Sequence, residues 1–281
     1  MTTNPNSAPI LFDRALLAAR QRRAARAPET FLMERVVEDM GDRLLAVNRS
    51  FADVADIWSP GGLRAPFVDR FAKFSYVVAP ETAREELGVA PQSLDLALSA
   101  LAFQFVNDLP GVLAQIRRSL RPDGLLLAAM IGGDSLTELR QAFAAAEAEC
   151  EGGVSPRVAP FADLRDIGGL LQRTGFALPV SDVDRVVVRY ANAFSLMQDI
   201  RRMGAANSLI ERRRTPTRRS TLLRMAEIYA ERFADPDGRI RATFDIIWLS
   251  GWAPHESQQK PLKPGSATAR LEDAVKRGTK A

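Results

Sequence analysis

Apolar runs and amphipathic stretches alternate along the chain between about residues 50 and 150. Mostly apolar runs bounded by turn residues predict four buried strands, at 50–58, 75–79, 93–100 and 125–131. Helical periodicity lies between and after these runs, at 63–74, 109–120 and 134–149. Strands that alternate with helices of this length predict a parallel, doubly wound α/β sheet with helices on both faces.

The rest of the chain continues this pattern and sets the expected boundaries. We expect further helices at 161–176, 194–203 and 220–233, and further strands at 184–190 and 242–252. A basic amphipathic helix is predicted over 11–28, ending near Pro28. We therefore divide the chain into a basic helical segment (1–45), an α/β domain (46–252) with a helical insertion at about 190–234, and a polar tail (253–281).

Composition narrows the class of protein. The chain has 281 residues, of which 46% are hydrophobic, enough for one large α/β domain or two small ones. No stretch approaches the roughly 20 apolar residues that span a bilayer, and the polar N-terminus has no secretory signal, so we expect a cytoplasmic protein. A single cysteine, Cys150, excludes an internal disulfide and fits a reducing compartment.

Arginine runs give the chain a modest net charge of +4. Two segments concentrate the positive charge, the helix at 11–28 and the run "ERRRTPTRR" at 211–219. We favour ordinary solvated surfaces for both, while the alternative is docking to an acidic partner or to lipid headgroups at the inner face of the membrane. No aromatic residues interleave with the charges, so we expect no nucleic-acid partner.

Several motifs together point to a family. The stretch "LRPDG" at 120–124 resembles a turn of the class I S-adenosylmethionine (SAM) methyltransferase superfamily. The more specific stretches, which cover nearly the whole chain, are "LFDRALLAARQRRAAR", "FVNDLP", "GGDSLTELR", "EGGVSPRVAPF", "MGAANS", "GWAPHESQQKP" and "GSAT". They resemble the respiratory complex I assembly factor branch, whose mitochondrial member hydroxylates an arginine, and more distantly the malonyl-acyl-carrier-protein methyltransferases of biotin synthesis.

The resemblance implies a fold, a cofactor and a partner. The fold is a Rossmann-like methyltransferase sheet, mostly parallel with an antiparallel last strand. The cofactor is SAM, and the partner is a core subunit of complex I. The implied activity is methyl transfer or modification of an arginine.

The first cofactor motif of the superfamily is altered in this chain. It places an acidic residue at the end of strand one and then three glycines at alternate positions. Asp56 matches the acid and Gly62 the third glycine, whereas Trp58 and Pro60 stand at the first two. An alignment shifted by one residue uses Gly61 and Gly62 and still has too few glycines. The indole would fill space that the methionine end of SAM needs, and Pro60 lacks an N–H donor.

Three further departures affect the same site. Val78 stands where an acidic residue would accept the ribose hydroxyls, with Glu81 three residues further on. The chain between Glu81 and Ser93 is too short for a helix and a third strand, so we expect the sheet to lack one edge strand. The family often has His-Trp where this chain has Gln104 and Phe105. The candidate cofactor-binding residues are Asp56, Gly61, Gly62, Gln104 and Phe105.

Candidate catalytic residues are few. Asp134 follows a predicted strand at the edge where open α/β sheets bind ligands, and its carboxylate could orient a guanidinium. We favour a cap of the following helix for Asp134, and the two roles are compatible. His255 is the only histidine, so no histidine-based metal site is possible and we expect no metal. Two functions remain open: an assembly factor with impaired or lost SAM binding, or an active SAM-dependent or arginine-modifying enzyme acting on a protein or acyl-carrier substrate.

Overall fold

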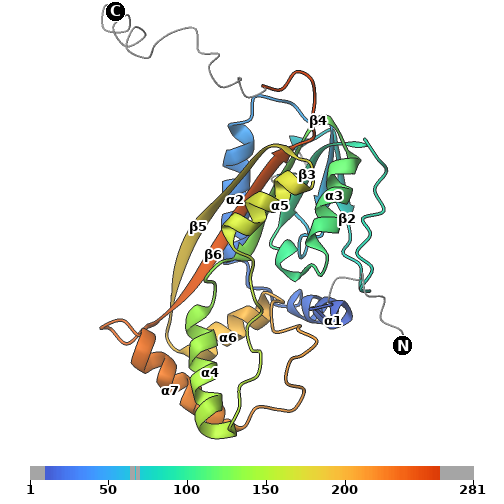
Figure 1. The fold of residues 1–281 in the computed structure, drawn as a ribbon. Coiled ribbons are helices and arrows are strands. Elements are labelled where there is room, and N and C mark those ends of the chain that lie inside the picture. Colours follow the sequence, from blue (N-terminus) through green and yellow to red (C-terminus); the bar gives the residue numbers. More distant parts are fainter. Residues whose placement is uncertain (1–9, 64–66, 68–69, 260–281) are drawn as a thin grey trace, which may run out of the picture.

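One six-stranded sheet organises the chain, as seen in a computed structural model that describes residues 10–63, 67 and 70–259 (Figure 1). Its strands, in the order β2-β1-β3-β4-β6-β5, are β1 (Asp53–Ile57), β2 (Lys73–Val77), β3 (Leu94–Ala100), β4 (Leu120–Gly132), β5 (Ala177–Tyr190) and β6 (Ile240–Trp252). The pairs β1–β2, β1–β3 and β3–β4 are parallel, and β6 runs antiparallel to both β4 and β5. The predicted fold class, with its antiparallel last strand, is confirmed.

Two hydrophobic clusters hold the helices on the sheet. Helices α3 (Leu109–Ser119) and α5 (Leu164–Arg173) pack on one face, and α2 (Phe31–Leu45) packs on the other (Figure 1). The remaining helices gather beyond the end of the sheet at which β1, β3 and β4 finish: α1 (Arg14–Ala24), α4 (Thr137–Glu151), α6 (Ala193–Arg202) and α7 (Arg219–Phe233). The central strands are buried on both faces, which explains why they read as continuous apolar runs.

The expected loss of an edge strand is confirmed. All residues from 78 to 93 are described, and they contain neither a helix nor a strand. The sheet therefore ends at β2, which pairs only with β1 among the described strands.

Some predicted boundaries were wrong. β2 begins at Lys73, inside the helix predicted at 63–74. Residues 64–66 and 68–69 of that prediction lie outside the described residues, as does the motif "GSAT". β5 begins at Ala177, seven residues before the predicted start. This strand alternates between exposed and half-buried side chains, so it lacks the apolar run that marked the central strands.

Candidate functional site

Two cavities flank the loop that follows β1, at the edge of the sheet where open α/β folds bind ligands. The larger has a volume of about 590 Å³ and lies between α1, the loop at 58–62 and the residues from Tyr76 to Glu81. The smaller, about 230 Å³, lies on the other side of Pro60 and Gly61, which line both cavities. The residues of the predicted cofactor motif, Asp56 and the loop at 58–62, line the larger cavity.

The loop after β1 keeps the left-handed backbone conformation that glycines favour, although a tryptophan stands at the position of the first glycine. Trp58 has φ of 65°, and Gly61 and Gly62 have φ of 77° and 73°. A Cβ at Gly62 would lie 2.9 Å from Cε1 of Tyr76, so a glycine is required there. The indole of Trp58 is 5% exposed and packs in the hydrophobic cluster that joins the sheet to α3 and α5. The backbone of the motif survives, and a large side chain now belongs to the core.

The buried side chain of Asp56 holds the two ends of this loop together by hydrogen bonds. Its side chain accepts hydrogen bonds from the Ser59 hydroxyl and from the Leu63 backbone N–H, the latter at 2.7 Å. The Ser59 hydroxyl in turn accepts the Ala100 N–H at 2.9 Å. Burial raises the pKa of Asp56, and the two hydrogen bonds oppose that effect. Both carboxylate oxygens are thus engaged by the protein's own donors.

Arg14 of α1 lies against Trp58 at the wall of the larger cavity. Its guanidinium sits 5.6 Å from the centre of the indole ring, a cation–π distance. It donates to the carbonyl oxygens of Phe105 at 3.0 Å and Pro80 at 3.3 Å, and it pairs with Glu85 at 3.6 Å. The side chains of Arg14 and Glu85 are 5% and 2% exposed. Desolvation lowers the pKa of Arg14, and Glu85 partly offsets this.

Glu85 comes from the segment that replaces the missing strand. Its carboxylate accepts the backbone N–H groups of Asn107 and Asp108 at 2.9 and 2.8 Å. The side chain of Asn107 accepts the N–H groups of Leu11 and Phe12 at 2.8 and 2.7 Å, so it ties down the start of the chain rather than facing a cavity. One network therefore connects α1, the segment at 78–93 and the loop after β3.

The end of β2 offers no carboxylate to the larger cavity. Val78, at the position of the family's acid, is 85% exposed. Glu81 lines the cavity but forms an ion pair with Arg22 of α1. Three arginines of the basic run at 211–219 pair within the chain: Arg212 with Asp13, and Arg213 and Arg218 with a glutamate of α4.

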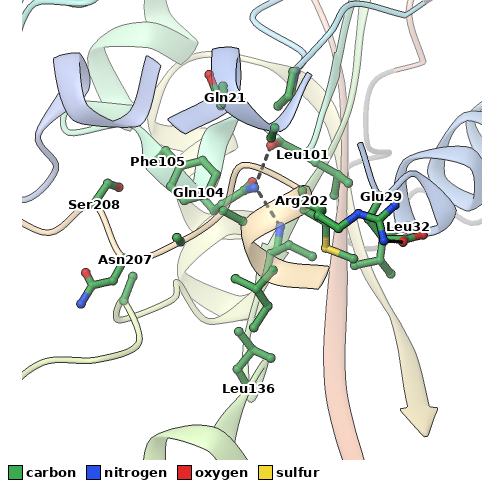
Figure 2. A pocket seen from close by; sticks show the side chains of 18 of the residues that line it. Gln21, Glu29, Leu32, Leu101, Gln104, Phe105, Leu136, Arg202, Asn207 and Ser208 are labelled. Carbon is green, nitrogen blue, oxygen red and sulfur yellow. Dashed lines mark hydrogen bonds and ion pairs between the residues drawn. The ribbon is translucent and has the colours of Figure 1, made fainter. Parts of the chain in front are cut away.

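The other candidate cofactor residues line the smaller cavity. Gln104 donates to the Leu101 carbonyl at 2.7 Å and accepts the Ile131 N–H at 3.4 Å, as Figure 2 shows. Phe105 lies beside it. Asp56, Gly61 and Gly62 line the larger cavity, so the structure gathers all five candidates around one loop.

Asp134 lines neither of the two cavities. Its side chain is 70% exposed and pairs with Arg185 at 2.8 Å, while its N–H donates to Asp245 at 2.9 Å. The helix cap predicted here is wrong, because α4 begins at Thr137, and its cap residue makes no side-chain hydrogen bond. Asp134 belongs to a surface ion-pair cluster with strands β5 and β6.

Sequence reasoning did not single out Arg14 within the basic helix predicted at 11–28. Arg14, Leu17 and Gln21 are three and four residues apart, so they share one helical face, and all three line the larger cavity. That spacing was the sequence signal from which their shared face could have been found. Within the described ranges, no three metal-ligating side chains come together, and no helix is long and apolar enough to cross a membrane.

Comparisons with known proteins agree with this architecture. A family described as a methyltransferase domain matches residues 65–128. The chain is 36% identical over 308 residues to the arginine-hydroxylase NDUFAF5, mitochondrial, of Rattus norvegicus, covering 99% of this chain and 89% of that protein. It is 38% identical over 181 residues to a malonyl-[acyl-carrier protein] O-methyltransferase of Laribacter hongkongensis, covering 64% of this chain and 58% of that protein.

A solved structure supports the fold alone. The crystal structure of a Bacillus halodurans protein described as a methyltransferase superposes with a TM-score of 0.51 at 13% sequence identity, covering 78% of this chain and 99% of that one. Among these three matches, the mitochondrial relative combines substantial identity with coverage of nearly the full length of both proteins. This chain therefore belongs to the NDUFAF5 family, within the class I SAM methyltransferase superfamily.

Proposed function

We propose that this chain acts in the assembly of respiratory complex I as a binding protein of methyltransferase fold that no longer holds SAM. The family relationship supports the assembly role, with a complex I core subunit as partner. The observation that carries the loss of SAM is the position of Arg14, whose guanidinium lies on Trp58 at the wall of the larger cavity. The sulfonium of SAM is also a cation, and two like charges in a poorly solvated site repel each other.

The residues around this cavity fit SAM poorly in two further respects. No carboxylate is available at Val78 to accept the ribose hydroxyls, and Glu81, three residues further on, is paired with Arg22. Asp56 is occupied by donors of its own loop. A cytoplasmic location and contact with a membrane surface remain predictions.

Isothermal titration with SAM tests the loss of the cofactor. We expect no heat of binding up to 1 mM SAM, which means that any binding free energy is weaker than roughly 4 kcal/mol. Micromolar binding to the wild type, weakened by Asp56→Asn in a folded protein, would overturn the proposal.

Complementation tests the assembly role without the cofactor. Ala18 lines the larger cavity from α1, whereas Ala15 on the same helix is exposed. In a strain that lacks this gene and has defective complex I, both Ala18→Trp and Ala15→Trp should restore the complex, because function does not need the cavity. Rescue by Ala15→Trp alone, with both variants folded by circular dichroism, would show that the cavity has to accept a ligand.

The second candidate function is an active SAM-dependent or arginine-modifying enzyme acting on a protein or acyl-carrier substrate. Its supporting observation is the cavity volume of about 590 Å³. That volume lies within the range of about 300–1,000 Å³ typical of ligand pockets, so size alone does not exclude a nucleotide.

A further inference from the structure

The smaller cavity lies on the other side of the altered cofactor loop, and Pro60 and Gly61 of that loop line both cavities. Its walls come from α1 and α2, from the residues that follow β3 and β4, and from the loop at 203–208 that follows α6 (Figure 2). Much of the lining is apolar: Leu32, Met33, Leu101, Phe105, Ile131, Leu136, Leu139, Ile200, Met203 and Phe244. An apolar cavity of this kind favours a ligand whose body is a hydrocarbon.

Several polar groups at the wall have partners within the chain, whereas one buried hydroxyl does not. Gln104 is bonded at both its oxygen and its nitrogen, and Arg202 donates to the Ala27 carbonyl and pairs with Glu29. Ser208 is 2% exposed, and its hydroxyl oxygen has no hydrogen-bond partner in the part of the chain that the structure describes. A buried donor without a partner costs about 1–3 kcal/mol, so a ligand acceptor here would be favoured.

The volume limits the size of the ligand. An apolar cavity of about 150 Å³ binds benzene, which has six non-hydrogen atoms. By the same ratio, the volume of about 230 Å³ accommodates about nine. The charged side chains at the wall already have partners, Glu29 for Arg202 and Glu147 for Arg157, so the site favours a neutral molecule.

We propose that this cavity binds an uncharged small molecule of about nine non-hydrogen atoms, with an apolar body and one carbonyl oxygen that accepts a hydrogen bond from the Ser208 hydroxyl. Ser208 lines this cavity and not the larger one, so its hydrogen bond does not require SAM in the larger cavity, although Gln21, Pro60 and Gly61 line both. It goes beyond the proposed assembly role, which assigns no small ligand to the chain.

Two probes of equal size separate the hydrogen bond from the apolar fit. Acetophenone and α-methylstyrene each have nine non-hydrogen atoms, and only acetophenone carries an acceptor. We expect millimolar or tighter binding of both by ligand-observed NMR, with acetophenone bound about 3- to 10-fold more tightly, as one neutral hydrogen bond predicts. Failure of both probes to bind, or equal binding of the two, would overturn the proposal.

Three variants test which side chains bind the two probes and which one gives the preference for acetophenone. Ser208→Ala should remove the preference for acetophenone while keeping the binding of α-methylstyrene, whereas Ser220→Ala, at an exposed position, should change neither. Ala206→Leu adds three carbon atoms to a lining residue and should weaken both probes. If Ser208→Ala retains the preference, or Ala206→Leu leaves both affinities unchanged in a folded protein, the ligand does not occupy this cavity as proposed.

Discussion

Replacing Arg14 by methionine removes one buried charge and keeps most of the volume of its stem. The change deletes the ion pair with Glu85, the hydrogen bonds to the carbonyls of Phe105 and Pro80, and the contact with the indole of Trp58. Glu85 then stays almost fully buried without its cation, although its two backbone donors remain. We therefore expect Arg14→Met to destabilise the protein without changing its fold.

The size of this loss follows from the burial of the pair. Breaking a buried ion pair by removing one partner costs about 3–5 kcal/mol, because the other charge is left uncompensated. An unfolding entropy of about 2.1 cal/mol/K per residue gives about 1.7 °C per kcal/mol for a chain of 281 residues. Arg14→Met should accordingly lower Tm by about 5–8 °C in differential scanning calorimetry.

Arg22 provides the matched control on the same helix. Its ion pair with Glu81 is solvent-exposed, with side chains 62% and 54% exposed, and pairs of this kind contribute about 0–1 kcal/mol. Arg22→Met should therefore lower Tm by less than about 2 °C. Equal shifts for the two variants, or a shift below about 1 °C for Arg14→Met, would refute the view that Arg14 joins α1 to the sheet as a buried cation.

Two further changes test other parts of the structure. A hydrogen bond from Thr221 and then one from Arg213 lower the pKa of Glu151, so its stabilising effect is complete above the ordinary carboxyl pKa and is lost as the pH falls through the folded-state pKa. Thermal scans should show that the Tm gap between wild type and Glu151→Gln shrinks on acidification; a gap independent of pH would contradict this. Gly133 has φ of 55°, and a Cβ there would lie 2.6 Å from a carboxylate oxygen of β6, so Gly133→Ala should cost at least about 1–2 kcal/mol in urea unfolding. Gly153→Ala, with nothing within 4 Å of its Cβ, should cost under about 0.5 kcal/mol, and similar losses for both would be inconsistent with a steric origin.

The central sheet could be predicted from the sequence because its strands are buried on both faces. β3 and the second half of β4 are apolar at nearly every position, which leaves few alternatives to a parallel strand. The absent edge strand was also predictable, because too few residues separate Glu81 from Ser93. The first half of β5 was not, because Pro179 and the alternating exposure of its side chains give a weak strand signal.

The candidate site was predictable in position but not in detail. The loop after β1 was located by Asp56 and Gly62, which do flank the larger cavity. The burial of Arg14 depends on how α1 is rotated against the sheet, and that rotation is set by contacts more than 60 residues away, at Pro80 and Phe105. Helical periodicity fixes which residues share a face, but not which face meets the core.

The Arg14 network contacts Trp58 and Phe105, two residues at altered cofactor positions, so the two features are adjacent in the fold. A bound cofactor stabilises the native state by RT ln(1 + [L]/Kd), or about 2.7 kcal/mol at a hundredfold excess over Kd. If SAM is no longer held, as proposed, the folded protein lacks that stabilisation. Contacts within the chain then have to hold the N-terminal helix on the sheet. The buried pair of Arg14 and Glu85 spans the same elements, and the cost of breaking it, about 3–5 kcal/mol, is of similar size. Glu85 belongs to the segment at 78–93, which holds no strand, so this segment supplies the partner that the buried cation needs.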